Sequence, residues 1–150
     1  MKLRLLDKRF MTNESIKVIF DTNIWISFLI GKQLSKIKRH IANGSITIIV
    51  TDQLILELKT VTKREKLKKY FNSESVKELI ELLDTIAINV PIKTKHTICR
   101  DAKDNFLLDL IDFSNADFLV TGDKDLIALN PFQTAKILTP AEFEIIVIKL

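Results

Sequence analysis

Four acidic side chains from distant segments of this 150-residue chain have the chemistry of metal ligands: Asp21, Glu57, Asp104 and Asp123. Each stands where an apolar run ends or a helical pattern begins. Carboxylate oxygens are the ligands that Mg²⁺ and Mn²⁺ prefer. A metal ion held by them could activate water and offset the negative charge of a phosphodiester during hydrolysis. The pattern therefore predicts a divalent-metal site for phosphodiester chemistry.

Several polar residues beside these acids could complete such a site. The supporting candidates share a place within or next to an acidic motif: Thr22, Asn23, Asp101, Asn105 and Thr121. Asn23 could instead cap a helix, and for Asp101 alone a helix N-cap is the preferred interpretation. Asp125 could be an outer metal ligand or an acid at a helix start.

The sequence lacks the residue patterns that histidine, cysteine, phosphate-loop or zinc mechanisms require. His40 and His96 are not adjacent to an acidic motif, and both are expected at the surface. Cys99 has no neighbouring histidine and is expected to be buried or half-buried. The sequence has no glycine-rich phosphate loop and no Cys/His spacing for zinc. One cysteine permits no internal disulfide and fits a reducing compartment, so a cytoplasmic location is predicted.

Short apolar runs alternate with helical patterns along the chain. Strands are predicted at 17–20, 46–50, 88–90, 117–121 and 135–138. Helices are predicted at 24–30, 32–43, from 51 or 52 with a basic stretch to about 71, and at 73–86, 101–114, 123–129 and from Thr139, which begins a capping box. This order is typical of a three-layer α/β/α sandwich with a mainly parallel central sheet.

A parallel sheet would bring the acids together, because ligands bind outside the carboxyl ends of its strands. Asp104 begins an apolar stripe whose other members lie three, four and seven residues later, so it should point inward. A buried carboxylate without a partner is costly, and a cation would supply the missing charge. Asp109 and Asp112 lie off that stripe and are expected in solvent.

The chain carries a net charge of +4, with a dense basic segment after Glu57. Its candidate contacts to the phosphate backbone of a nucleic acid are Lys59, Lys63, Arg64 and Lys66. The alternative is a solvated helix face with no ligand. No apolar run approaches the ~18 residues of a membrane span. We expect residues 16–150 to form one domain and residues 1–15 to be an N-terminal extension outside it.

The ordered set of motifs resembles the PIN domain family, and within it the VapC-like toxins of toxin–antitoxin systems. The resemblance spans about residues 17–145. It rests on Val18–Trp25, on Glu57 after the second strand, on Cys99–Asn105, on Val120–Leu126 and on Ile137–Phe143. One such motif would be weak evidence, whereas the ordered set is specific.

The resemblance implies a metal-dependent endoribonuclease that uses Mg²⁺ or Mn²⁺. Asp21, Glu57, Asp104 and Asp123 match the four acids of the family, and Asp125 is carried over as a possible further metal ligand. The implied reaction is attack of a metal-activated water on an RNA phosphodiester, which leaves a 5′-phosphate and a 3′-hydroxyl. The implied partners are RNA, a second copy of the chain, and an antitoxin that covers the acidic cleft.

Three other functions remain open from the sequence. One is a metal-dependent DNA or flap-type nuclease of the same broad fold. Another is a haloacid-dehalogenase-like phosphatase, which is disfavoured because its motif needs a second Asp where this chain has Asn23. The third is a non-catalytic scaffold that binds RNA or a protein partner.

Overall fold

The computed structural model describes residues 15–32 and 34–149. Within these residues a parallel sheet has five strands in the order β3-β2-β1-β4-β5. The strands are β1 (Ile16–Phe20), β2 (Ile46–Val50), β3 (Ile88–Asn89), β4 (Phe118–Val120) and β5 (Lys136–Leu138). Since every neighbouring pair is parallel, the prediction of an α/β fold with a parallel sheet is confirmed.

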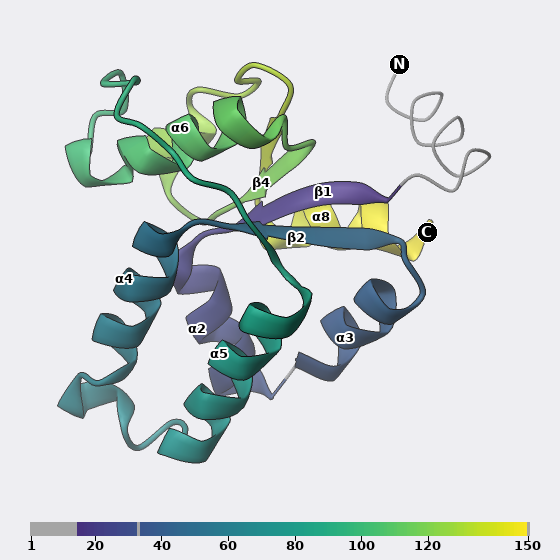
Figure 1. Ribbon diagram of the computed structural model, residues 1–150, viewed down its shortest axis with the longest axis vertical. Coiled ribbons are helices and arrows are strands. Elements are labelled where there is room, and N and C mark those ends of the chain that lie inside the picture. Colours follow the sequence, from purple (N-terminus) through teal and green to yellow (C-terminus); the bar gives the residue numbers. More distant parts are fainter. Residues whose placement is uncertain (1–14, 33, 150) are drawn as a thin grey trace.

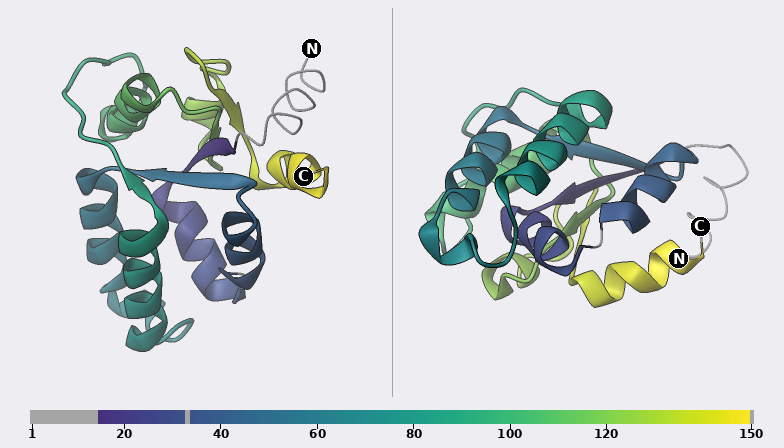
Figure 2. Two further views of the ribbon diagram at one scale, coloured as in Figure 1. Left: turned by 45° about the vertical axis from the view of Figure 1, so that its right-hand side comes forward. Right: turned by 90° about the horizontal axis from the view of Figure 1, so that it is seen from below.

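Helices cover both faces of this sheet. One face carries α2 (Thr22–Gly31), α3 (Leu34–Ala42), α4 (Asp52–Thr62) and α5 (Ser73–Ile86), and the other carries α6 (Asn105–Ser114), as Figures 1 and 2 show. The chain ends with α7 (Lys124–Ile127) and α8 (Pro140–Ile148), and the predicted capping box at Thr139 begins α8. Two short 3₁₀ turns are η1 (Glu65–Leu67) and η2 (Ala102–Asp104).

Aromatic packing fixes the helices around the end of β1. The ring of Phe20 lies 5.1 Å from that of Trp25, 5.4 Å from Phe28 and 5.6 Å from Phe143, all edge-on. Trp25 and Phe28 belong to α2 and Phe143 to α8, so these two helices share one face of the sheet. Trp25 and Phe28 are therefore core residues and not a base-stacking surface.

The strand order reverses at β1, which lies between β2 and β4. Such a switch point leaves a crevice beyond the carboxyl ends of the two strands, where ligands of open α/β sheets bind. Phe20 is paired with Val120 in the register of β1 and β4. Asp21 and Thr121 therefore follow side by side at the switch point, and the Asp21 N–H donates to the Val120 carbonyl at 3.1 Å.

The helix predicted over 101–114 consists of two parts, η2 and then α6. Asp101 caps η2 by accepting the Lys103 N–H at 3.3 Å, and the Asn105 side chain accepts the Cys99 N–H at 2.8 Å. These local bonds favour a tighter turn before the α-helix begins. Similarly, α4 ends at Thr62, and the rest of the basic stretch that was expected to be helical up to about residue 71 contains only η1.

Segment 91–98 crosses α6 and buries a face that was expected in solvent. Asp109 is only 3% exposed, and its Oδ1 accepts the N–H groups of Lys95 and His96 at 3.2 and 2.8 Å. Asp112 Oδ2 lies 2.7 Å from Lys95 Nζ and 3.0 Å from His96 Nε2. The prediction that Asp109 is solvated is wrong. The apolar stripe of a helix identifies one buried face, and it gives no sign that another segment covers a second face. His96 is likewise mostly buried, against Phe132.

Residues 1–14 of the predicted N-terminal extension lie outside the described residues. Of the helices within the described ranges, none has the length and apolar character needed to cross a membrane.

Candidate metal centre

Asp21 is buried at the carboxyl end of β1, where α2 begins. Its Oδ1 accepts the Ile24 N–H at 3.1 Å, as an N-cap does, and its Oδ2 accepts the hydroxyl proton of Thr121. Burial raises the pKa of the Asp21 carboxyl and the Asp123 charge raises it further, while the Thr121 hydroxyl and the N–H groups of Ile24 and Asn23 oppose the shift. The side chain is thus fixed in orientation, and a nearby cation would favour its charged form.

Thr121 connects the ends of β1 and β4. Its fully buried hydroxyl donates to Asp21 and accepts the Asp123 N–H at 3.0 Å. Asp123 in turn caps α7, with its Oδ1 accepting the Asp125 N–H at 2.8 Å. This chain of hydrogen bonds holds Asp21 and Asp123 in fixed relative positions across the switch point.

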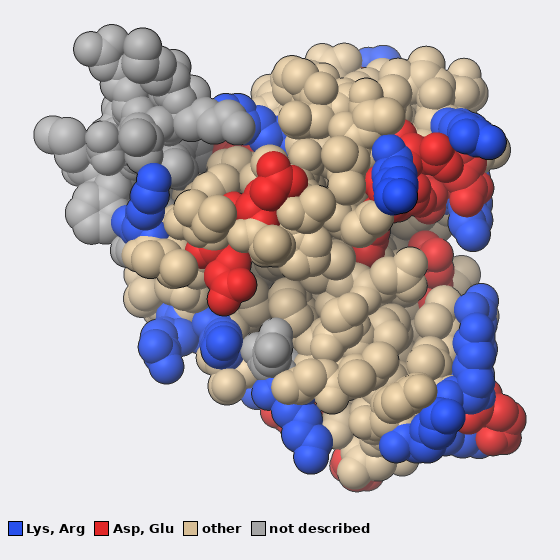
Figure 3. Space-filling model, turned by 180° about the vertical axis from the view of Figure 1, so that it is seen from behind, with Lys and Arg blue, Asp and Glu red and all other residues tan. Residues whose placement is uncertain are grey.

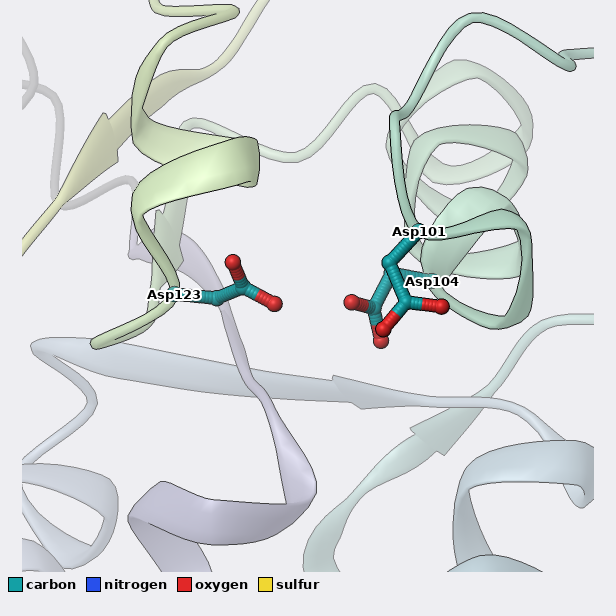
Figure 4. A group of neighbouring side chains, drawn as sticks. All are labelled: Asp101, Asp104 and Asp123. Atoms are coloured by element: carbon teal, nitrogen blue, oxygen red, sulfur yellow. The ribbon is translucent and has the colours of Figure 1, made fainter.

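Three carboxylates from two segments approach each other at the site. One oxygen each of Asp101, Asp104 and Asp123 lies within 4.8 Å of the others. Figure 4 shows Asp123 reaching from the segment after β4 toward Asp101 and Asp104, which come from the turn before α6. Because residues three apart align in a 3₁₀ turn, η2 brings Asp101 and Asp104 to the same side.

Asp104 is the most perturbed member of this group. Burial raises its pKa to about 7, assisted by hydrogen bonding to the Asp123 carboxyl and by the charges of Asp123 and Asp101, whereas Lys103 opposes the rise. Its Oδ2 is buried without a hydrogen-bond partner among the described residues. The donor atoms are all carboxylate oxygens, so the set fits a hard divalent cation, which would satisfy that oxygen and offset the crowded charge.

The other predicted residues are not members of this group. Glu57 is half-buried on α4 and lies outside the group of three carboxylates. Asp125 is half-buried and contributes its N–H to Asp123. Thr22 is buried beside Asp21, and its hydroxyl has no partner within the described residues, while Asn23 is exposed.

Sequence reasoning preferred a capping role for Asp101, and the structure shows the cap together with a place in the carboxylate group. The spacing of Asp101 and Asp104 could have indicated this, but only with the knowledge that a 3₁₀ turn lies between them. Asn105 is buried and orders the turn through Cys99, which is itself buried as expected.

Charged side chains of both signs border the site. Figure 3 shows Asp and Glu gathered about a hollow at one edge of the molecule, with Lys and Arg beside them. The four basic candidates for RNA contact are all exposed, but they divide into two pairs. Lys59 and Lys63 line a groove beside α4, whereas Arg64 and Lys66 do not line it.

The fold and this acidic crevice agree with the comparison to known families. The model of the PIN domain family matches residues 17–125, a range that contains Asp21, Glu57, Asp104 and Asp123, and the chain belongs to this family. PIN domains are generally metal-dependent nucleases.

Two known proteins are similar over most of their length. The chain is 30% identical over 122 residues to the uncharacterized protein MJ1680 of Methanocaldococcus jannaschii, which covers 79% of this chain and 78% of that one. The crystal structure of PAE2754 from Pyrobaculum aerophilum superposes with a TM-score of 0.59 over 90% of this chain and 91% of that one. At 11% sequence identity, the second likeness shows a shared fold.

Proposed function

We propose that this protein is an endoribonuclease that requires Mg²⁺ or Mn²⁺ and acts as the toxin of a toxin–antitoxin pair. The observation that supports it most is the group of carboxylates at the switch point, which includes a buried Asp104 oxygen without a partner among the described residues. The toxin role rests on the resemblance of the motifs to the VapC-like branch of the family.

In this proposal Asp21, Glu57, Asp104 and Asp123 hold the metal, and Asp125 contributes from outside. A bound divalent ion would supply charge stabilisation for the phosphodiester and lower the pKa of water. The Thr121 hydroxyl fixes the orientation of the Asp21 carboxylate by donating to its Oδ2 atom. On binding of a divalent ion, the Asp104 carboxyl would release to solvent the proton that its raised pKa lets it hold near neutral pH. Thr22, Asn23, Asp101 and Asn105 position the acids and the water.

The substrate class follows from the resemblance and from the basic surface beside the acids. Comparing single-stranded RNA with branched DNA as substrates tests it. We expect metal-dependent cuts in the RNA that leave 5′-phosphates. Cleavage of branched DNA in preference to RNA would replace the proposal with a flap-type nuclease. RNA binding without cleavage of either would favour a scaffold.

The proposed partners are a second copy of the chain and an antitoxin that covers the acidic cleft in the cytoplasm. Light scattering on the purified protein tests the first: we expect the mass of a homodimer. Co-expression with the protein encoded beside it tests the second. We expect a co-purified complex with no RNase activity, and full activity in such a complex would contradict inhibition at the cleft.

A further inference from the structure

A groove lies between the far end of α4 and the start of α5, away from the sheet. The two helices run side by side below the sheet, and the segment with η1 joins them (Figure 1). The groove has a volume of about 780 Å³, within the range of ligand-sized clefts. Its lining includes Lys59, Lys63, Lys68, Lys77, Phe71 and Ser73. We call it the lysine groove.

The lysine groove carries positive charge that the described residues neutralise only in part. Lys59 and Lys63 make no ion pair within the described residues. Lys68 and Lys77 have carboxylate partners, Glu65 at 3.0 Å and Glu81 at 4.0 Å, but both pairs are exposed and weak. Ser73 begins the 14-residue α5, whose N-terminal dipole adds positive potential at the same place.

This combination suits phosphate groups better than a protein surface. Lysine is depleted from the buried centres of protein–protein interfaces, where aromatic residues and arginine are enriched. Sites for single-stranded nucleic acids combine basic side chains that follow the backbone with an aromatic side chain near the bases. The lysine groove has four lysines and the half-buried Phe71.

The groove is separate from the candidate metal centre. At about 100° per residue, Lys59 and Lys63 lie roughly 200° and 240° around α4 from Glu57, which is on the opposite side of the helix. A nucleic acid bound at both places must cross α4, whose diameter is ~10 Å. A very short oligonucleotide could therefore occupy the metal centre without reaching the groove.

We propose that the lysine groove is an exosite that binds backbone phosphates of the RNA substrate a few nucleotides from the cleaved bond. This inference takes its substrate class from the proposed function. It assigns Lys59 and Lys63 to substrate affinity, with no part in the chemical step.

The test compares Lys59→Gln/Lys63→Gln with Lys36→Gln/Arg39→Gln, a variant that removes the same charge from exposed positions on α3. Binding of an RNA of about 30 nucleotides is measured by fluorescence anisotropy in EDTA at several salt concentrations. We expect the groove variant to lose on the order of tenfold in affinity and to lower the salt slope by about 1.4, or ~0.7 for each lost phosphate contact. The α3 variant should keep a slope close to that of the wild type.

Cleavage with Mn²⁺ separates the exosite from the proposed function. The groove variant should have a raised KM for the long RNA and an unchanged rate on an oligonucleotide of about six nucleotides. Equal effects of the two double variants on the long RNA would overturn the exosite. Unchanged RNA affinity in the groove variant would also overturn it, and would favour an acidic protein as the partner of the groove. If the wild type cleaves no RNA but loses RNA affinity in the groove variant, the proposed function fails, and the lysine groove remains an RNA-binding site without a role in cleavage.

Discussion

The single hydroxyl group of Thr121 makes hydrogen bonds on both sides of the switch point. It donates to Asp21 and accepts from the Asp123 backbone. Valine has nearly the same shape and offers neither bond. Without the donor, the pKa of the buried Asp21 carboxyl should rise further, and the Asp123 N–H would lack its acceptor.

We expect Thr121→Val to weaken Mn²⁺ binding by about tenfold and to lower cleavage accordingly, since each lost hydrogen bond to a charged group is worth about 1.5–3 kcal/mol. Isothermal titration with Mn²⁺ measures the first effect. Thr134→Val is the matched control, because its hydroxyl donates to the Ala116 carbonyl at 2.7 Å and takes no part in the acidic group. Equal losses in the two variants would indicate a general effect on stability.

Asp104 should make the stability of the metal-free protein depend on pH. Its folded pKa of about 7 lies above the ordinary value of 3.8, so the protonated form is favoured by folding. The contribution of this carboxyl is fully present below about pH 4 and is lost as the pH rises through 7. Asn resembles the protonated carboxyl. Asp104→Asn should therefore gain stability over the wild type as the pH rises, by about 1–2 kcal/mol at pH 8 after allowing for solvent screening.

Urea denaturation in EDTA at pH 5 and pH 8 measures this difference. Curves that keep the same separation at both pH values would contradict the assignment. With Mn²⁺ present the order should reverse, because the ion binds the ionised wild-type carboxyl. Metal affinity of the wild type should accordingly increase with pH up to about 7.

The site depends on the ends of β1 and β4 and on the turn before α6, which differ in how readily the sequence predicts them. The end of β1 and the end of β4 could be predicted because their apolar runs stop at Asp21 and Thr121. The turn before α6 could not, because the 3₁₀ geometry depends on caps from Asp101 and Asn105 that also fit an ordinary helix start. The carboxylate group accordingly contains Asp101, whereas Glu57 on α4 is not one of its members.

The position of segment 91–98 against α6 could not be predicted from the sequence either. Its docking on α6 depends on hydrogen bonds between residues about 13 positions apart, which no local pattern indicates. The same bonds support a prediction. Asp109→Ala should lower the free energy of unfolding by about 2 kcal/mol, because two N–H groups lose their acceptor.

Urea denaturation of Asp109→Ala measures this loss, with the exposed Glu144→Ala on α8 as the control. Exchange of the Lys95 and His96 amides should also accelerate in Asp109→Ala. Unchanged exchange together with unchanged stability would show that the segment is held by other contacts.

The whole molecule has a common α/β arrangement, and the place where its strand order reverses determines where the site lies. The parallel sense of the sheet could be predicted from the alternation of short apolar runs and helices, but the order of its strands could not. The switch point between β1 and β4 depends on long-range pairing, and the register of Phe20 with Val120 follows only from the structure. The acids converge because this pairing brings segments 100 residues apart into hydrogen-bond contact.

Cleavage of a mixed RNA pool tests the central proposal most directly. The purified protein is incubated with Mg²⁺ or Mn²⁺, with EDTA, and in parallel as Asp21→Asn. The account predicts cuts that need the metal and are lost in the variant, while circular dichroism shows both proteins folded. Absence of cleavage by folded wild-type protein with metal bound, or equal cleavage by Asp21→Asn, would contradict the proposed metal-dependent nuclease.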